Sequence, residues 1–271
     1  MTRLADRDVV QAQSGAPTLL ERLVRQDRTI ASAGLIIVTL LCWLWIVPMA
    51  RDMYGSMTGA SAWMMRAAWD TRHLVLLWAM WMVMMAGMML PSAAPILLLY
   101  GGLLRKRRNP WHSAARIYAM GAGYLLVWAV FSVGATALQR ILSRLLLLTP
   151  MMETATPRAQ GILLLIAGVY QLSPQKAACL HVCRTPVSFL TQHWREGVRG
   201  ALSMGIAHGV YCLGCCWALM LLLFAGGVMN LLVIGALTIL VLIEKLAPFG
   251  LRSSRVSGAA FIGLALWLLA G

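Results

Sequence analysis

The sequence predicts an all-α fold: a polytopic membrane helix bundle of about seven transmembrane helices with a cytoplasmic N-terminus. Three observations lead to this fold class. Hydrophobic residues make up 60% of the 271 residues and charged residues only 12%, which lies outside the range of ordinary soluble domains. The apolar residues fall into runs long enough to cross a hydrocarbon core. The 23 Lys and Arg residues lie between these runs, so the net charge of +14 does not indicate a nucleic-acid surface.

Seven apolar runs account for the bundle, and we expect them to form one transmembrane domain over residues 30–271. The runs cover residues 30–49, 73–100, 113–139, 158–173, 200–225, 228–244 and 256–270. The fourth and the last are short for a span, which needs about 20 residues. Residues 1–29 are polar and charged, and they lack the pattern of a cleaved signal peptide. We therefore expect them to form a cytoplasmic tail.

The basic residues orient the predicted bundle. With a cytoplasmic N-terminus, 17 Lys and Arg residues lie in inner segments and 6 in outer segments. This asymmetry follows the positive-inside rule and places the C-terminus outside. Because the clustered cysteines then lie at or below the inner leaflet, structural disulfides are not expected.

The run at 200–225 carries metal-binding side chains along one face. His208, Cys212, Cys215 and Cys216 follow an i, i+4, i+7, i+8 spacing, which places them within an arc of roughly 100° on a helix. An ionisable group inside a membrane indicates function, whereas a free cysteine alone can serve as a small packing residue. The first and last of the four lie about 12 Å apart along the axis, so they cannot all bind one ion. A tetrahedral site would need ligands from another helix.

The run at 73–100 is rich in methionine. Six methionines lie in one stretch of this run: Met80, Met82, Met84, Met85, Met88 and Met89. Thioether sulfur is a soft ligand suited to Cu(I), but Met also serves as an adaptable packing residue. We take the last four of these methionines as candidate metal ligands. Pro91 should loosen the helix around Gly87 and leave a backbone carbonyl in need of a partner.

The loop after the fourth run carries a second pair of thiols. Cys179 and Cys183 are four residues apart and share a face if this stretch is helical. Two thiolates can supply two metal ligands, and the neighbouring Lys176 and Arg184 should lower the pKa of both thiols. Cys42, in contrast, stands alone in the first run and is interpreted as a packing residue.

Glu244 and Lys245 lie near the inner end of the sixth run. We interpret them as an ion pair or a helix-end charge pattern. Gly205 and Gly209 form a small-x3-small pattern, which favours close packing between membrane helices.

Four blocks of the chain resemble a family of bacterial polytopic inner-membrane proteins, which are described as predicted metal-binding integral membrane proteins. The blocks are residues 81–92, 170–186, 208–220 and 227–231, the last together with Glu244 and Lys245. They lie within a family-like core of about 73–250, and the two cysteine blocks are highly specific. Gly87 stands where the family commonly has Ala. The resemblance implies a multi-pass protein of the bacterial inner membrane that binds a metal ion.

The favoured hypothesis is binding, handling or transport of a transition metal, with copper(I) preferred and zinc as the alternative. Outer methionines, among them Met49, Met53 and Met57, would collect the ion, and the thioethers of the 73–100 run would pass it to the 200–225 run. Cys179 and Cys183 would form an inner exit or regulatory site. The expected partners are the lipid bilayer, the metal ion and a periplasmic or membrane partner protein, with no nucleic acid. We assign no catalytic residue.

Two other function classes stay open. Cys212 and Cys215 form a Cys-x2-Cys pair that could cycle between dithiol and disulfide in a membrane thiol redox protein. The unusual residues could instead only build tight helix packing in a structural or assembly protein. Elemental analysis of the purified protein separates the metal hypothesis from these two.

Overall fold

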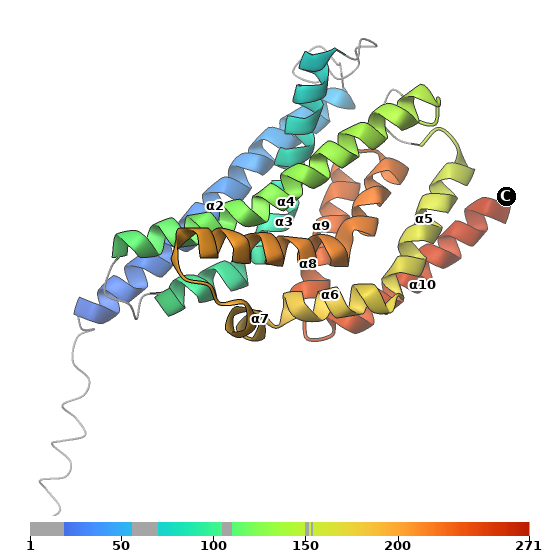
Figure 1. Ribbon diagram of the computed structural model, residues 1–271. Helices are drawn as coiled ribbons and strands as arrows, with labels where there is room; N and C mark the ends of the chain where they lie inside the picture. Colours follow the sequence, from blue (N-terminus) through green and yellow to red (C-terminus); the bar gives the residue numbers. More distant parts are fainter. Residues whose placement is uncertain (1–18, 56–69, 105–109, 150–151, 153, 271) are drawn as a thin grey trace, which may run out of the picture.

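The computed structural model describes residues 19–55, 70–104, 110–149, 152 and 154–270, and it confirms the all-α fold class (Figure 1). The helices in these ranges are α2 (Leu19–Met53), α3 (Thr71–Leu104), α4 (Pro110–Arg144), α5 (Pro157–Gln171), α6 (Pro174–Arg184), α7 (Pro186–His193), α8 (Gly197–Gly226), α9 (Leu231–Leu246) and α10 (Gly250–Ala270). The N-terminal end of α2 and the C-terminal end of α10 lie at opposite ends of the molecule.

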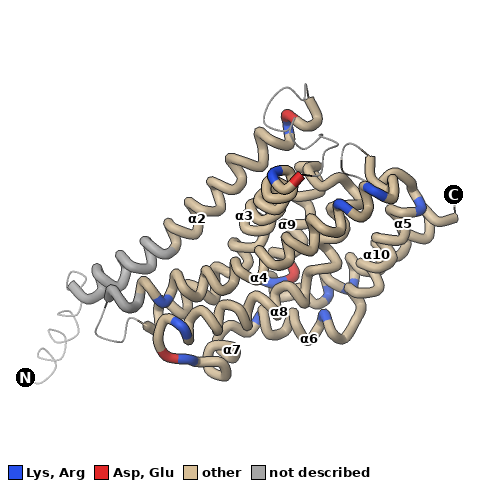
Figure 2. Tube along the Cα trace, turned by 45° about the horizontal axis from the view of Figure 1, so that its top comes forward, with Lys and Arg blue, Asp and Glu red and all other residues tan. Residues whose placement is uncertain are grey.

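Five of the described helices are long and apolar enough to cross a membrane. They are Ser32–Met53 within α2, Thr71–Leu104, Ala114–Arg144 within α4, Gly197–Gly226 and Gly250–Ala270. Charged residues gather toward the ends of the bundle and are sparse in its middle (Figure 2). The length and composition of these helices fit a protein associated with a membrane.

The structure differs from the seven expected spans at α5 and α9. They occupy the positions of the fourth and sixth apolar runs, but they contain only 15 and 16 residues. Proline explains both ends, because Pro174 starts the next helix directly after α5 and Pro248 follows α9. α5 packs antiparallel to α10, since Gly161 lies against Leu269 and Gly168 lies against Gly258.

α3 stays helical through Pro91. Pro91 has no backbone N–H for the carbonyl of Gly87, and a neighbouring helix supplies a hydrogen-bond donor instead. The indole nitrogen of Trp43 in α2 donates to the carbonyl of Gly87 over 3.3 Å. The hydroxyls of Ser92 and Tyr124 donate to the carbonyl of Met89, at 2.8 and 3.1 Å. The expected carbonyl acceptor is therefore confirmed, and α2 and α4 are both tied to α3 at this level.

Glycines bring α4 and α8 into close contact. A Cβ on Gly205 would collide with the carbonyl oxygen of Met120, and a Cβ on Gly123 would collide with the carbonyl oxygen of Leu202. A Cβ on Gly209 would lie 2.9 Å from the side chain of Val127. The predicted small-x3-small packing is confirmed, and α4 is the helix that it contacts.

A buried polar network fixes α6 in place. The ammonium of Lys176 lies 2.6 Å from the carboxylate of Glu244, and both side chains are at least 98% buried. The amide of Gln171 donates to the same carboxylate over 2.7 Å, and the guanidinium of Arg184 donates to the Glu244 carbonyl over 2.6 Å. The structure does not pair Glu244 with Lys245, as the sequence suggested; the partner of Glu244 is Lys176 of α6. The network joins α5, α6 and α9.

Candidate metal centre

α6 carries two of the predicted thiols toward α8. The Ser173 hydroxyl caps α6 by accepting from the backbone of Lys176, and Pro174 occupies the first turn. The loop that holds Cys179 and Cys183 is therefore helical, as the shared face required. Gly214 of α8 permits the close approach, because a Cβ there would lie 2.8 Å from the sulfur of Cys179.

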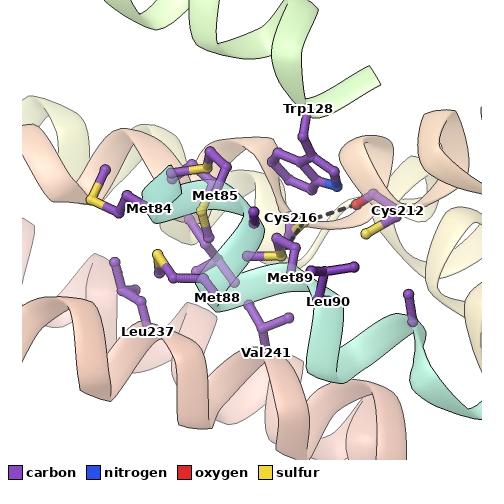
Figure 3. Packing of buried hydrophobic residues seen from close by; sticks show 14 of the residues in the cluster. Met84, Met85, Met88, Met89, Leu90, Trp128, Cys212, Cys216, Leu237 and Val241 are labelled. Carbon is purple, nitrogen blue, oxygen red and sulfur yellow. Dashed lines mark hydrogen bonds between the residues drawn. The ribbon is translucent and has the colours of Figure 1, made fainter. Parts of the chain in front are cut away.

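Two consecutive residues of α8 each face a sulfur atom of a different helix. The sulfur of Cys215 lies 4.0 Å from the sulfur of Cys183 in α6. The sulfur of Cys216 lies 4.0 Å from the thioether of Met89 in α3. Figure 3 shows Met89 and Cys216 side by side, with Cys212 next to them. We call Met89, Cys183, Cys212, Cys215 and Cys216 the sulfur cluster.

Cys212 links the sulfur cluster to a buried cation. Its sulfur lies 2.8 Å from the ammonium of Lys245 and 3.0 Å from the hydroxyl of Tyr124. The ammonium also donates to the hydroxyl of Ser92 over 3.1 Å. The side chains of Cys212, Lys245 and Tyr124 are all buried. In these low-dielectric surroundings the ammonium favours negative charge on the nearby sulfur.

The backbone of α8 orients the other two thiols. The carbonyl oxygen of Cys212 accepts from the sulfur of Cys215 over 3.1 Å and from the sulfur of Cys216 over 2.9 Å. Because successive residues of a helix point about 100° apart, Cys215 reaches the sulfur of Cys183 in α6 and Cys216 reaches that of Met89 in α3. The cysteines of α8 therefore do not all point into a single cage.

The expected lowering of the thiol pKa values in α6 is wrong. Burial raises the pKa of Cys179, and the nearby Cys215 raises it further. The hydrogen bond with Cys215 raises the pKa of Cys183 well above its usual value, and burial adds to this rise. The two cations of α6 point elsewhere: Lys176 and Arg184 both bond to Glu244.

The remaining methionine candidates lie in the hydrophobic core of the bundle. Met84, Met85 and Met88 are completely buried in the core. Figure 3 shows Met88 beside Leu237 and Val241 of α9. Among the described residues, Met89 is the methionine in sulfur contact with a cysteine. Met85 lies one turn before Met89 on α3, and Met84 lies one turn before Met88.

His208 lies one turn before Cys212 and is 4% exposed. Its ring packs against the rings of Tyr124 and Phe189, with centroids 5.9 and 5.3 Å away. Its Nδ1 atom is buried and has no hydrogen-bond partner among the described residues. Within the described ranges, no three His, Cys, Asp or Glu side chains lie close enough together to hold a metal ion. The centre thus consists of sulfur pairs rather than a closed cage.

Lys245 belongs to this centre, although it was not among the residues expected from the sequence. The signal was present, because a lysine within an apolar run is costly and needs a partner. Its neighbour Glu244 suggested a local pair, but successive residues of a helix point in directions about 100° apart. Glu244 therefore reaches α6, while Lys245 reaches Cys212 of α8. Of the outer candidates, Met57 lies outside the described residues, whereas Met49 and Met53 are buried.

Comparison with known proteins identifies a family for this chain. The model of the PpoB2 family, described as copper chaperone, matches residues 78–268. This range contains the whole sulfur cluster, Lys245 and most of the bundle from α3 to α10. Searches among curated proteins and among solved structures give no match. The resemblance noted above concerned an unspecified metal, and this match points to copper. The chain belongs to the PpoB2 copper chaperone family.

Proposed function

We propose that the protein binds copper(I) at the sulfur cluster, within the bacterial inner membrane, and passes it between sulfur pairs. The observation that carries this proposal is the pair of 4.0 Å contacts made by Cys215 and Cys216. Zinc–thiolate bonds are about 2.3 Å long, so two sulfurs on one ion of this size lie at most about 4.6 Å apart. Each pair has a spacing at which both sulfurs can bind the same ion.

The donor set supports a soft monovalent ion over zinc. Thiolate and thioether sulfur select Cu(I), whereas structural zinc takes four ligands in a closed tetrahedron. Charge also favours copper(I). Two thiolates of Cys183 and Cys215 carry two negative charges, and the buried ammonium of Lys245 carries one positive charge. A monovalent ion then brings the sum to zero, and an uncompensated charge inside a membrane is costly.

The order of ligands along the bundle supports a direction of transfer. Met84, Met85 and Met88 would offer neutral thioethers first, and Met89 with Cys216 would offer one thioether and one thiol. The pair of Cys183 and Cys215 offers two thiols, which bind Cu(I) more strongly when ionised. Cys179 is partly exposed on α6 and would be the exit. His208, with its free Nδ1, would be an additional ligand one turn away.

The membrane setting belongs to the same proposal. We place the N-terminus in the cytoplasm and count α5 and α9 as short spans, so that residues 30–271 form one seven-span domain. The antiparallel packing of α5 on α10 supports this arrangement. α6 then lies on the cytoplasmic side, and the ion would move inward, toward a partner protein that receives it.

Metal stoichiometry tests the proposal. The purified protein, loaded with Cu(I) under anaerobic conditions, should retain copper after removal of free ions, as measured by elemental analysis. Cys183→Ser and Cys215→Ser should each release the same copper equivalent, and the double variant should release no more than either one. Cys42→Ser is the matched control, because Cys42 lies on α2, where its Cβ faces Gly87, and is not a member of the sulfur cluster. Equal copper content in all variants would overturn the proposal.

A thiol redox function is the second candidate, and one contact favours a particular pair for it. Cys183 and Cys215 are 4.0 Å apart, and a disulfide of about 2.05 Å would form after a small approach of α6 to α8. Each thiol would give up one proton and one electron to a quinone, which would become a quinol. Differential alkylation would detect this disulfide after quinone treatment. Thiols that stay reduced under quinone and lose reactivity only with Cu(I) would exclude the redox function.

A further inference from the structure

A groove runs along the outside of the bundle between the first half of α3 and the last half of α4. Its volume is about 520 Å³, within the usual range for small-molecule sites. Leu74 and Trp78 of α3 form one wall, and Val133 and Ile141 of α4 form the other. Both helices are long and apolar enough to cross a membrane. The side chains of Val133 and Ile141 are more than half exposed, so the groove opens on a face that the bilayer would cover.

Two arginines lie at one end of this groove. Arg140 and Arg144 lie one turn apart on α4 and both line the groove, whose lining contains no Asp or Glu. The Nε atom of Arg140 is buried and has no hydrogen-bond partner in the part of the chain that the structure describes. An unpaired donor of a guanidinium group is unfavourable, and an anion bound in the groove would supply an acceptor for it.

The position of the arginines identifies the kind of ligand. Arg144 is the last residue of α4, at the end of a membrane-length helix where lipid headgroups lie. These arginines belong to the six basic residues on the predicted outer side, where the positive-inside rule disfavours them. An anion bound there would compensate their charge. The apolar walls extend from the arginines toward the middle of the helix, so the ligand must also carry a hydrocarbon chain.

We propose that this groove is a binding site for one anionic phospholipid. The phosphate accepts hydrogen bonds from Arg140 and Arg144, and one acyl chain lies between Leu74, Trp78 and Val133. Basic pockets between membrane helices recognise anionic headgroups in this way. The inference stands on its own observations and does not depend on copper binding.

Native mass spectrometry of the full chain in detergent tests the proposal, with phosphatidylglycerol and phosphatidylcholine of identical acyl chains as probes. The protein should retain one phosphatidylglycerol at concentrations at which phosphatidylcholine does not bind. Arg140→Gln with Arg144→Gln should weaken phosphatidylglycerol binding by at least about tenfold. Arg158→Gln removes the same kind of charge from an exposed position on α5 and should leave binding unchanged.

A second variant tests the apolar wall independently of the arginines. Val133→Trp should fill the groove and block the lipid while both guanidinium groups remain. Glycerol phosphate, the headgroup without chains, should not compete with phosphatidylglycerol. Equal binding of the two lipids, equal losses in Arg158→Gln and the double variant, or full competition by glycerol phosphate would each overturn the proposal.

Discussion

Replacing Lys245 by Gln should change which metal ions the sulfur cluster prefers. The ammonium lies 2.8 Å from the sulfur of Cys212. A metal on that sulfur would lie about 2.3 Å from it, so the two positive charges would be at most about 5 Å apart. At an effective dielectric constant of about 20, each unit of charge on the ion is then repelled by about 3 kcal/mol. A divalent ion carries one more unit of charge than Cu(I), so this repulsion weakens its binding by about 100-fold relative to the binding of Cu(I).

Competition with chromophoric chelators measures this effect under anaerobic conditions, once for Cu(I) and once for Zn(II). The preference for Cu(I) over Zn(II) should fall by about 100-fold in Lys245→Gln and should persist in Lys245→Arg, which keeps the charge. The ratio is informative because both ions displace the same thiol protons, so the cost of deprotonation cancels. An unchanged ratio in Lys245→Gln, or the same fall in both variants, would refute the electrostatic reasoning.

Two further predictions concern stability, measured as the free energy of unfolding in one detergent. Lys176→Met should destabilise the protein by about 3–5 kcal/mol, because the Glu244 carboxylate stays buried without its cation, and adding Glu244→Gln should recover most of this loss. A double variant as unstable as the single one would contradict the ion pair. Gly205→Ala should cost about 1–3 kcal/mol, because its Cβ would collide with the Met120 carbonyl. Gly121→Ala on α4 meets open space and should be neutral or slightly stabilising, so equal effects would argue against close packing.

Much of the fold follows from local pattern. Long apolar runs predicted the five membrane-length helices, and the Gly205 and Gly209 spacing predicted a close helix contact. The short α5 and α9 also follow from the sequence, since the expected runs at 158–173 and 228–244 match their bounds within three residues. Which helix packs against Gly205 depends on the topology of the whole bundle, and that information is spread over the chain.

The candidate site, too, could be predicted from the sequence only in part. Helical periodicity places Cys212, Cys215 and Cys216 on one face, and these three residues are buried together. Periodicity gives no information on which helix faces each thiol, so the contacts with Cys183 and Met89 needed the structure. The thiol pKa values were mispredicted for a similar reason. Basic neighbours in sequence lower a pKa only if their charges also lie near the thiol in space.

X-ray absorption spectroscopy of the Cu(I)-loaded protein reports directly which atoms bind the copper. Copper held by the sulfur cluster gives a first shell of two or three sulfur atoms, with no nitrogen or oxygen dominating it. The same spectrum should lose sulfur scatterers in the Cys183→Ser, Cys215→Ser double variant and stay unchanged in Cys42→Ser. A shell of nitrogen and oxygen ligands, or a sulfur shell and a copper content that both stay unchanged after removal of both cysteines, would contradict copper binding at the pair of Cys183 and Cys215.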